Sequence, residues 1–154
     1  MSDDVDTHGL PRVDEHCVEV DVGADLVWRA LTDELARRPR PGAGLVAAIL
    51  GCSERRPGGA PDRPGSTLVG FRVAQAQPPA RLTLAGRHRL SRYALTFTVA
   101  QLGEDRSRLC AATDAAFPGP HGRAYRAIVV GSGMHARTVL GLLTRIARRA
   151  RSQP

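Results

Sequence analysis

The sequence predicts an α+β domain in which a run of antiparallel strands packs against one long C-terminal helix. Between residues 67 and 116, apolar and polar residues alternate in short runs separated by turn residues, which is typical of half-buried strands. From about 122 to 151, apolar residues instead recur at the spacing of one helix face, and arginines fill most of the other positions. A helix of roughly 30 residues is about 45 Å long. We therefore expect it to lie across the sheet and to enclose a ligand cavity with it.

The first half of the chain mixes helices with strands. Residues 16–22 alternate as a strand, and a helix is predicted from 24 to about 33. A second short helix is predicted over 34–38, where the prolines that follow would end it. The apolar run 45–51 favours a strand, and the prolines and glycines of 54–65 indicate an exposed loop.

Four strands follow, at 67–75, 81–88, 91–102 and 107–116. Strand alternation places an apolar set on one side of the first three strands. This set, which we expect to face the long helix, comprises Val69, Phe71, Val73, Leu82, Leu84, Gly86, His88, Tyr93, Leu95, Phe97 and Val99. In the fourth strand, Asp114 is expected to face solvent and to pair with an arginine.

Length and composition indicate one domain, with residues 1–13 as a disordered acidic lead-in and 14–151 as the folded unit. No apolar run approaches the ~18 residues of a membrane span, and the acidic N-terminus does not resemble a secretory signal. The three cysteines at 17, 52 and 110 suggest neither a disulfide framework nor a zinc site, so the sequence predicts a cytoplasmic protein.

The charge is distributed unevenly. All 22 basic residues are arginines, and the net charge is +7. Residues 1–34 hold ten acids and two arginines, net −8, whereas residues 35–154 hold five acids and twenty arginines, net +15. The simplest interpretation is attraction within the chain, and the alternative is an anionic partner. The arginines of 145–151 could make transient contact with an anionic membrane surface, and the scarcity of aromatic residues argues against nucleic acid.

Four segments together resemble the START-related helix-grip superfamily, also called SRPBCC: VEVDVGADLVWRALTD, PGSTLVGFRV, PPARLTLAGRHRLSRYALTFTV and SRLCAATDAAFPGPHGRAYRAIV. This superfamily includes lipid-transfer proteins and polyketide cyclase-like proteins. The resemblance covers about residues 14–150. It implies a curved antiparallel sheet wrapped around a long C-terminal helix, with a deep apolar cavity between them. It does not imply one ligand, because fold alone does not decide function.

Eight residues are candidates for ligand contact: Phe71, His88, Tyr93, Leu95, Phe97, Tyr125, Ser132 and His135. His88 and Tyr93 could form a polar pair at one end of the cavity, and the alternative for each is a structural role. Gly131 and Gly133 interrupt the long helix and favour either a kink or close contact. They would leave room for a ligand or allow close packing on the sheet. No Gly-x-Ser-x-Gly motif supports a hydrolase triad.

These observations leave three functions open. The first is binding of a small hydrophobic or amphipathic ligand, lipid- or polyketide-like. The second is a polyketide cyclase/dehydrase-like enzyme with His88 and Tyr93 as acid–base groups. The third is an interaction module that uses an arginine-rich surface. We expect no cofactor and, because the five histidines are scattered, no metal. The oligomeric state is left open.

Overall fold

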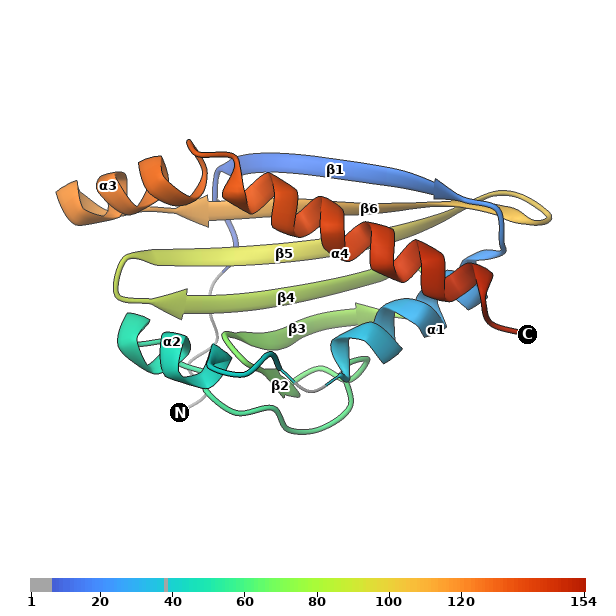
Figure 1. The fold of residues 1–154 in the computed structure, drawn as a ribbon, viewed down its shortest axis with the longest axis horizontal. Coiled ribbons are helices and arrows are strands. Elements are labelled where there is room, and N and C mark those ends of the chain that lie inside the picture. The colour runs from blue at the N-terminus through green and yellow to red at the C-terminus, as the bar shows by residue number, and fades with distance from the viewer. Residues whose placement is uncertain (1–6, 38) are drawn as a thin grey trace.

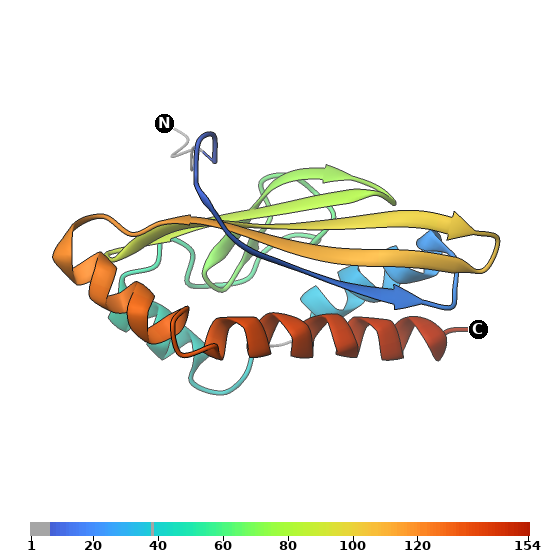
Figure 2. The ribbon, with the colours of Figure 1, turned by 90° about the horizontal axis from the view of Figure 1, so that it is seen from above.

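Six strands form one antiparallel sheet, and the four helices cover one of its faces (Figures 1 and 2). The computed structural model describes residues 7–37 and 39–154. In chain order the elements are β1 (Arg12–Val20), α1 (Ala24–Leu35), α2 (Ala43–Leu50), β2 (Thr67–Leu68), β3 (Phe71–Gln77), β4 (Arg81–His88), β5 (Ser91–Gly103), β6 (Arg106–Ala116), α3 (Gly119–Val129) and α4 (Met134–Arg151). The strands lie in the order β1-β6-β5-β4-β3-β2. The predicted α+β class and helix-grip arrangement are confirmed.

The core lies between the inner face of the sheet and helices α1 and α4. Phe97, Leu82 and Leu84 point inward from the strands and are almost fully buried. They pack with Leu31 of α1 and with an apolar stripe of α4 that includes Leu143. The alternation in β4 and β5 therefore predicted the buried face correctly, because side chains two residues apart share one side of a strand.

The long C-terminal helix is not continuous, so the prediction of one helix from 122 to 151 is wrong. The chain breaks between α3 and α4, which are bent by 54°. Gly133 caps α4 with a φ of +75°, a left-handed conformation that glycine adopts most readily. Gly131 and Gly133 do not line the cavity described below. The bend between α3 and α4 at these glycines is the kink that two glycines in a helix favour.

No single helix among the described residues is long and apolar enough to cross a membrane, although the bent pair α3–α4 would pass by length and composition.

Three other element predictions are corrected. The run 45–51 forms helix α2 rather than a strand, with Gly42 and Gly51 in left-handed conformations at its two ends. A short apolar run does not distinguish a strand from a helix by periodicity alone. The predicted helix 34–38 is absent among the described residues: α1 ends at Leu35, and residue 38 lies outside them. The predicted strand 67–75 is split into β2 and β3 at Gly70, where φ is +83°.

The folded unit begins earlier than residue 14. Strand β1 starts at Arg12, whose guanidinium lies 2.5 Å from the Asp114 carboxylate. The carbonyl of Pro11 accepts a hydrogen bond from the backbone N–H of Ala115. The predicted lead-in 1–13 is therefore too long at its C-terminal end, and residues 1–6 lie outside the described part of the chain.

Deleting residues 1–13 should destabilise the protein more than deleting residues 1–10. The longer deletion removes the Pro11–Ala115 hydrogen bond and the Arg12–Asp114 ion pair. Such contacts contribute about 1 kcal/mol and less than about 1 kcal/mol respectively, so the expected difference is about 1–2 kcal/mol. Urea denaturation of the two truncated proteins measures it. Equal stabilities would show that residues 11–13 are dispensable, as the sequence predicted.

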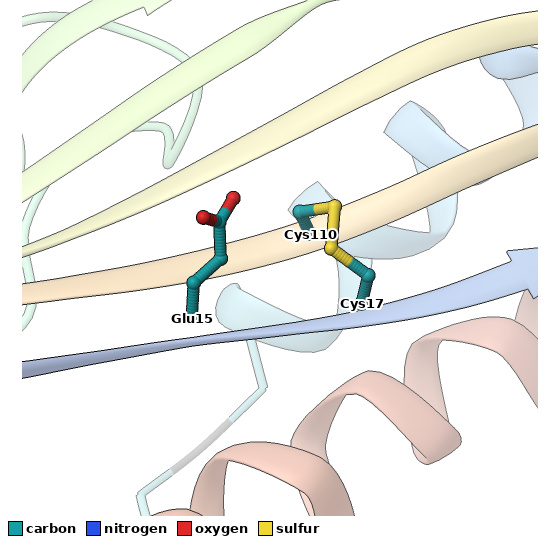
Figure 3. Close-up of side chains that lie close together, drawn as sticks. All are labelled: Glu15, Cys17 and Cys110. Carbon is teal, nitrogen blue, oxygen red and sulfur yellow. A yellow bond between two sulfur atoms is a disulfide. The ribbon is translucent and has the colours of Figure 1, made fainter.

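Cys17 of β1 and Cys110 of β6 face each other in the strand register and form a disulfide (Figure 3). This pairing contradicts the expectation that the cysteines form no bridge. Since stable disulfides are typical of oxidising compartments, it also removes the argument for a reducing cytoplasm. Glu15 lies beside the two sulfurs. In the disulfide neither sulfur is a thiolate, so the group offers no thiolate ligand to a metal ion.

Candidate functional site

A cavity of about 620 Å³ lies between the inner face of the sheet and helices α2 and α3. Strands β3 to β6 form its floor, and His135 near the start of α4 contributes to its lining. Helices α2 and α3, which lie on opposite sides of one end of the sheet (Figure 1), form its walls. Its volume is within the range of small-molecule sites, about 300–1,000 Å³. Arg40 is the one arginine among its lining residues, and none of them is acidic.

Six of the eight predicted contact residues line this cavity: Phe71, His88, Tyr93, Leu95, Tyr125 and His135. Phe97 does not, because it lies further along the same face of β5, where it is fully buried in the core with residues of α1 and α4. Ser132 does not either. It is exposed in the break between α3 and α4, where its hydroxyl accepts a hydrogen bond from the N–H of Met134.

Aromatic rings gather at one end of the cavity. The His88 ring centroid lies 5.5 Å from that of Tyr93 and 5.0 Å from that of Tyr125. Phe71 packs edge-on against Tyr93 at 5.2 Å. These separations are typical of favourable aromatic pairs. They bring together residues of β3, β4, β5 and α3, including His88 and Tyr93, which the sequence predicted to lie at one end of the cavity.

His88 is held as a neutral hydrogen-bond donor. Its Nδ1 accepts a hydrogen bond of 3.1 Å from the backbone N–H of Leu90, which assigns the ring proton to Nε2. Burial lowers the pKa of His88 below its ordinary value, so the neutral ring is favoured. The Nε2–H is then the group available to a ligand oxygen.

The lowered pKa of His88 predicts an acid-sensitive contribution to stability. As the pH falls through about 6.5, the ordinary histidine pKa, the unfolded chain takes up a proton at this position before the folded chain does. The folded state is then disfavoured. His88→Gln should remove this contribution. Between pH 7.5 and 5.5, the wild type should therefore lose more stability than the variant in urea denaturation. An identical pH dependence would show that His88 titrates normally.

Tyr93 is fixed by a hydrogen bond of 2.6 Å from its hydroxyl to the carbonyl of Gly70. Burial, followed by the neighbouring Cys52 thiol, raises the pKa of Tyr93 above its ordinary range. Burial also raises the pKa of Tyr125. Both phenols therefore stay protonated at neutral pH. Cys52, a buried free thiol just after α2, was not among the contact residues predicted from the sequence.

A second polar group borders the cavity near β1. The Nε2 of His135 lies 2.9 Å from the Thr113 hydroxyl and 3.5 Å from Oδ1 of Asp14. The other oxygen of Asp14 lies 3.2 Å from the His16 ring. These contacts join β1, β6 and α4. The cavity therefore has hydrogen-bonding side chains in two separate places, with apolar surface between them.

Helices α2 and α3 are weakly anchored. Only Ala47 of α2 and Gly122 of α3 are buried. Leu45 and Ile49 on α2 are 67% and 65% exposed, and Ile128 on α3 is 65% exposed. Elements with few buried contacts open at low cost. Since both helices form walls of the cavity, their movement would admit a ligand.

The predicted ion pair of Asp114 with an arginine, here Arg12, is confirmed. Part of the C-terminal arginine cluster is also engaged within the chain: Arg145 and Arg149 lie 3.0 and 3.6 Å from the Glu34 carboxylate. These pairs match the interpretation that the acidic N-terminal part attracts the basic body.

Comparison with solved structures agrees with this architecture. Norcoclaurine synthase from Thalictrum flavum, in complex with dopamine and hydroxybenzaldehyde, is 13% identical with a TM-score of 0.56, and the match covers 92% of this chain and 87% of that one. The Zhui aromatase/cyclase from Streptomyces sp. R1128 is 16% identical with a TM-score of 0.54, over 90% and 92% of the two chains. This chain has the helix-grip fold.

A third similar structure is DynU16, a protein of the dynemicin biosynthetic locus, which is 20% identical with a TM-score of 0.55. The match covers 90% of this chain but 46% of DynU16. Neither a protein-family model nor a curated protein sequence matches the chain. At these identities the comparisons show the helix-grip fold, and the function has to be argued from the cavity.

Proposed function

We propose that this protein binds a small, mainly apolar molecule in the cavity between the sheet and helices α2 and α3. The observation that carries the proposal is the cavity of about 620 Å³, which places apolar surface beside a few hydrogen-bonding groups. This combination is typical of small-molecule sites. His88 would donate to an oxygen of the ligand, and the rings of Tyr93 and Tyr125 would stack against its apolar body.

The test measures uptake of a neutral apolar fluorophore, N-phenyl-1-naphthylamine, by the wild type and by a variant with a smaller cavity. Leu95 lines the cavity from β5, so the larger side chain of Leu95→Trp should narrow it and lower the fluorescence increase. The matched control is Leu102→Trp, because Leu102 is exposed near the far end of β5 and does not line the cavity. Unchanged uptake by a folded Leu95→Trp protein would contradict the proposal.

A cyclase-type reaction is the second candidate, since an aromatase/cyclase is among the similar structures and His88 and Tyr93 are in ring contact. The hydrogen bonds of these residues favour a specific role. A neutral His88 that donates from Nε2 polarises a carbonyl, while the Tyr93 proton is engaged with Gly70. The enzyme would then turn over a linear poly-β-keto substrate, and His88→Ala would lose turnover. Binding without turnover favours the first candidate.

A further inference from the structure

A second groove, of about 410 Å³, adjoins the cavity and is lined by four arginines. Arg12 lies at the start of β1, Arg92 at the start of β5, and Arg123 and Arg126 on α3. The groove shares Val13, Ala115 and Phe117 with the cavity, so the two have a common wall. A molecule that reached across this wall would meet apolar surface on one side and guanidinium groups on the other.

Among the described residues, one of these four arginines is paired with acidic side chains and the other three are not. Arg12 is engaged, since its guanidinium lies 2.5 Å from Asp114 and 3.3 Å from Glu15. Arg92, Arg123 and Arg126 have no ion-pair partner among residues 7–37 and 39–154. No acidic side chain of this described part lines the groove. Within the described part of the chain, the groove is therefore a local concentration of unpaired positive charge.

Such a concentration favours one class of ligand group. Like charges at i,i+3 positions of a helix repel each other, as Arg123 and Arg126 do on α3. A bound anion would attract both guanidinium groups and so offset their mutual repulsion. The guanidinium group presents paired N–H donors that match phosphate oxygens, and such charge-assisted hydrogen bonds are among the strongest in proteins.

We propose that the arginine groove binds the phosphate group of a ligand whose apolar part occupies the adjoining cavity. The assignment of the apolar part rests on the proposed function, whereas the phosphate site is argued from the groove alone. The ligand class is then a phosphate ester of an apolar molecule. Its phosphate could belong to a free amphiphile or to a lipid headgroup in a bilayer.

The test compares decyl phosphate with decanol as competitors of N-phenyl-1-naphthylamine. Decyl phosphate should displace the fluorophore at a concentration at least about tenfold lower than decanol, a difference of about 1.4 kcal/mol. The double variant Arg123→Gln/Arg126→Gln should lose this preference while its displacement by decanol is unchanged. Arg106→Gln/Arg148→Gln is the control, because it removes the same charge from exposed positions outside the groove and should retain the preference.

Equal displacement by both compounds, or loss of the preference in the control variant, would overturn the phosphate site. If neither compound displaces the fluorophore, the proposed cavity function fails. In that case the groove is tested by itself with inorganic pyrophosphate. Pyrophosphate should raise the melting temperature of the wild type but not of Arg123→Gln/Arg126→Gln. An equal rise in both proteins, or no rise, would overturn it.

Vesicles of phosphatidylcholine containing about 30% phosphatidic acid distinguish the two sources of the phosphate. Binding to them, but not to pure phosphatidylcholine, that is lost in the groove variant assigns the site to a lipid headgroup. Preference for decyl phosphate without vesicle binding assigns it to a free phosphate ester.

Discussion

Replacing Phe97 with alanine should lower the free energy of unfolding by about 3–5 kcal/mol. Phe97 is fully buried in the middle of β5. Its register neighbours are Leu82 of β4 and Ala111 of β6, and it belongs to the core that α1 and α4 cover. Truncation would leave a void that close-packed neighbours fill only in part. Urea denaturation followed by circular dichroism measures the loss.

Phe71→Ala is the matched control for this prediction. It removes the same atoms from a residue that lines the ligand cavity and is only partly buried, so the loss should be clearly smaller. The contrast tests where the core ends and the cavity begins. A loss below about 1 kcal/mol for Phe97→Ala would mean that the inner face of the sheet is assigned to the wrong residues.

The sheet could be predicted because its signal is local. The predicted range 81–88 matches the observed strand β4. Alternation correctly placed Leu82 and Leu84 of β4, and Phe97 of β5, on the buried side of the sheet. The same reasoning put Phe97 and Tyr93 on one face but could not tell that the first packs in the core while the second borders a cavity. That difference depends on how far α4 extends over the sheet, which is a tertiary property.

The errors have a common physical cause. The run 45–51 is apolar on every side, so its periodicity could not reveal that it forms a helix with exposed Leu45 and Ile49. Since α2 forms one wall of the cavity, that wall could not be predicted either. The Cys17–Cys110 bridge joins residues 93 apart in sequence. The pairing of β1 with β6 brings them together, and spacing alone does not indicate it. The arginine groove likewise gathers arginines from three elements, β1, β5 and α3.

Replacing Gly86 with alanine should both destabilise the protein and disturb the aromatic end of the cavity. Gly86 lies on β4, two residues before His88, and the space beside it is filled. A Cβ atom at Gly86 would lie 2.5 Å from Cε2 of Tyr93 and closer still to the carbonyl oxygen of Gly70. These are the two groups joined by the Tyr93 hydrogen bond. One of them has to move, and the obstructing Gly70 oxygen is backbone, which yields less readily than a flexible side chain.

The expected loss for Gly86→Ala is about 1–3 kcal/mol, the usual cost of overpacking a filled site. Because the displaced Tyr93 ring borders the cavity, uptake of N-phenyl-1-naphthylamine should also fall. Gly103→Ala is the matched control, since a Cβ atom there meets nothing within 4 Å and Gly103 does not line the cavity. That variant should keep both stability and uptake. If Gly86→Ala loses stability but binds the fluorophore normally, Tyr93 supports the strand without shaping the ligand site.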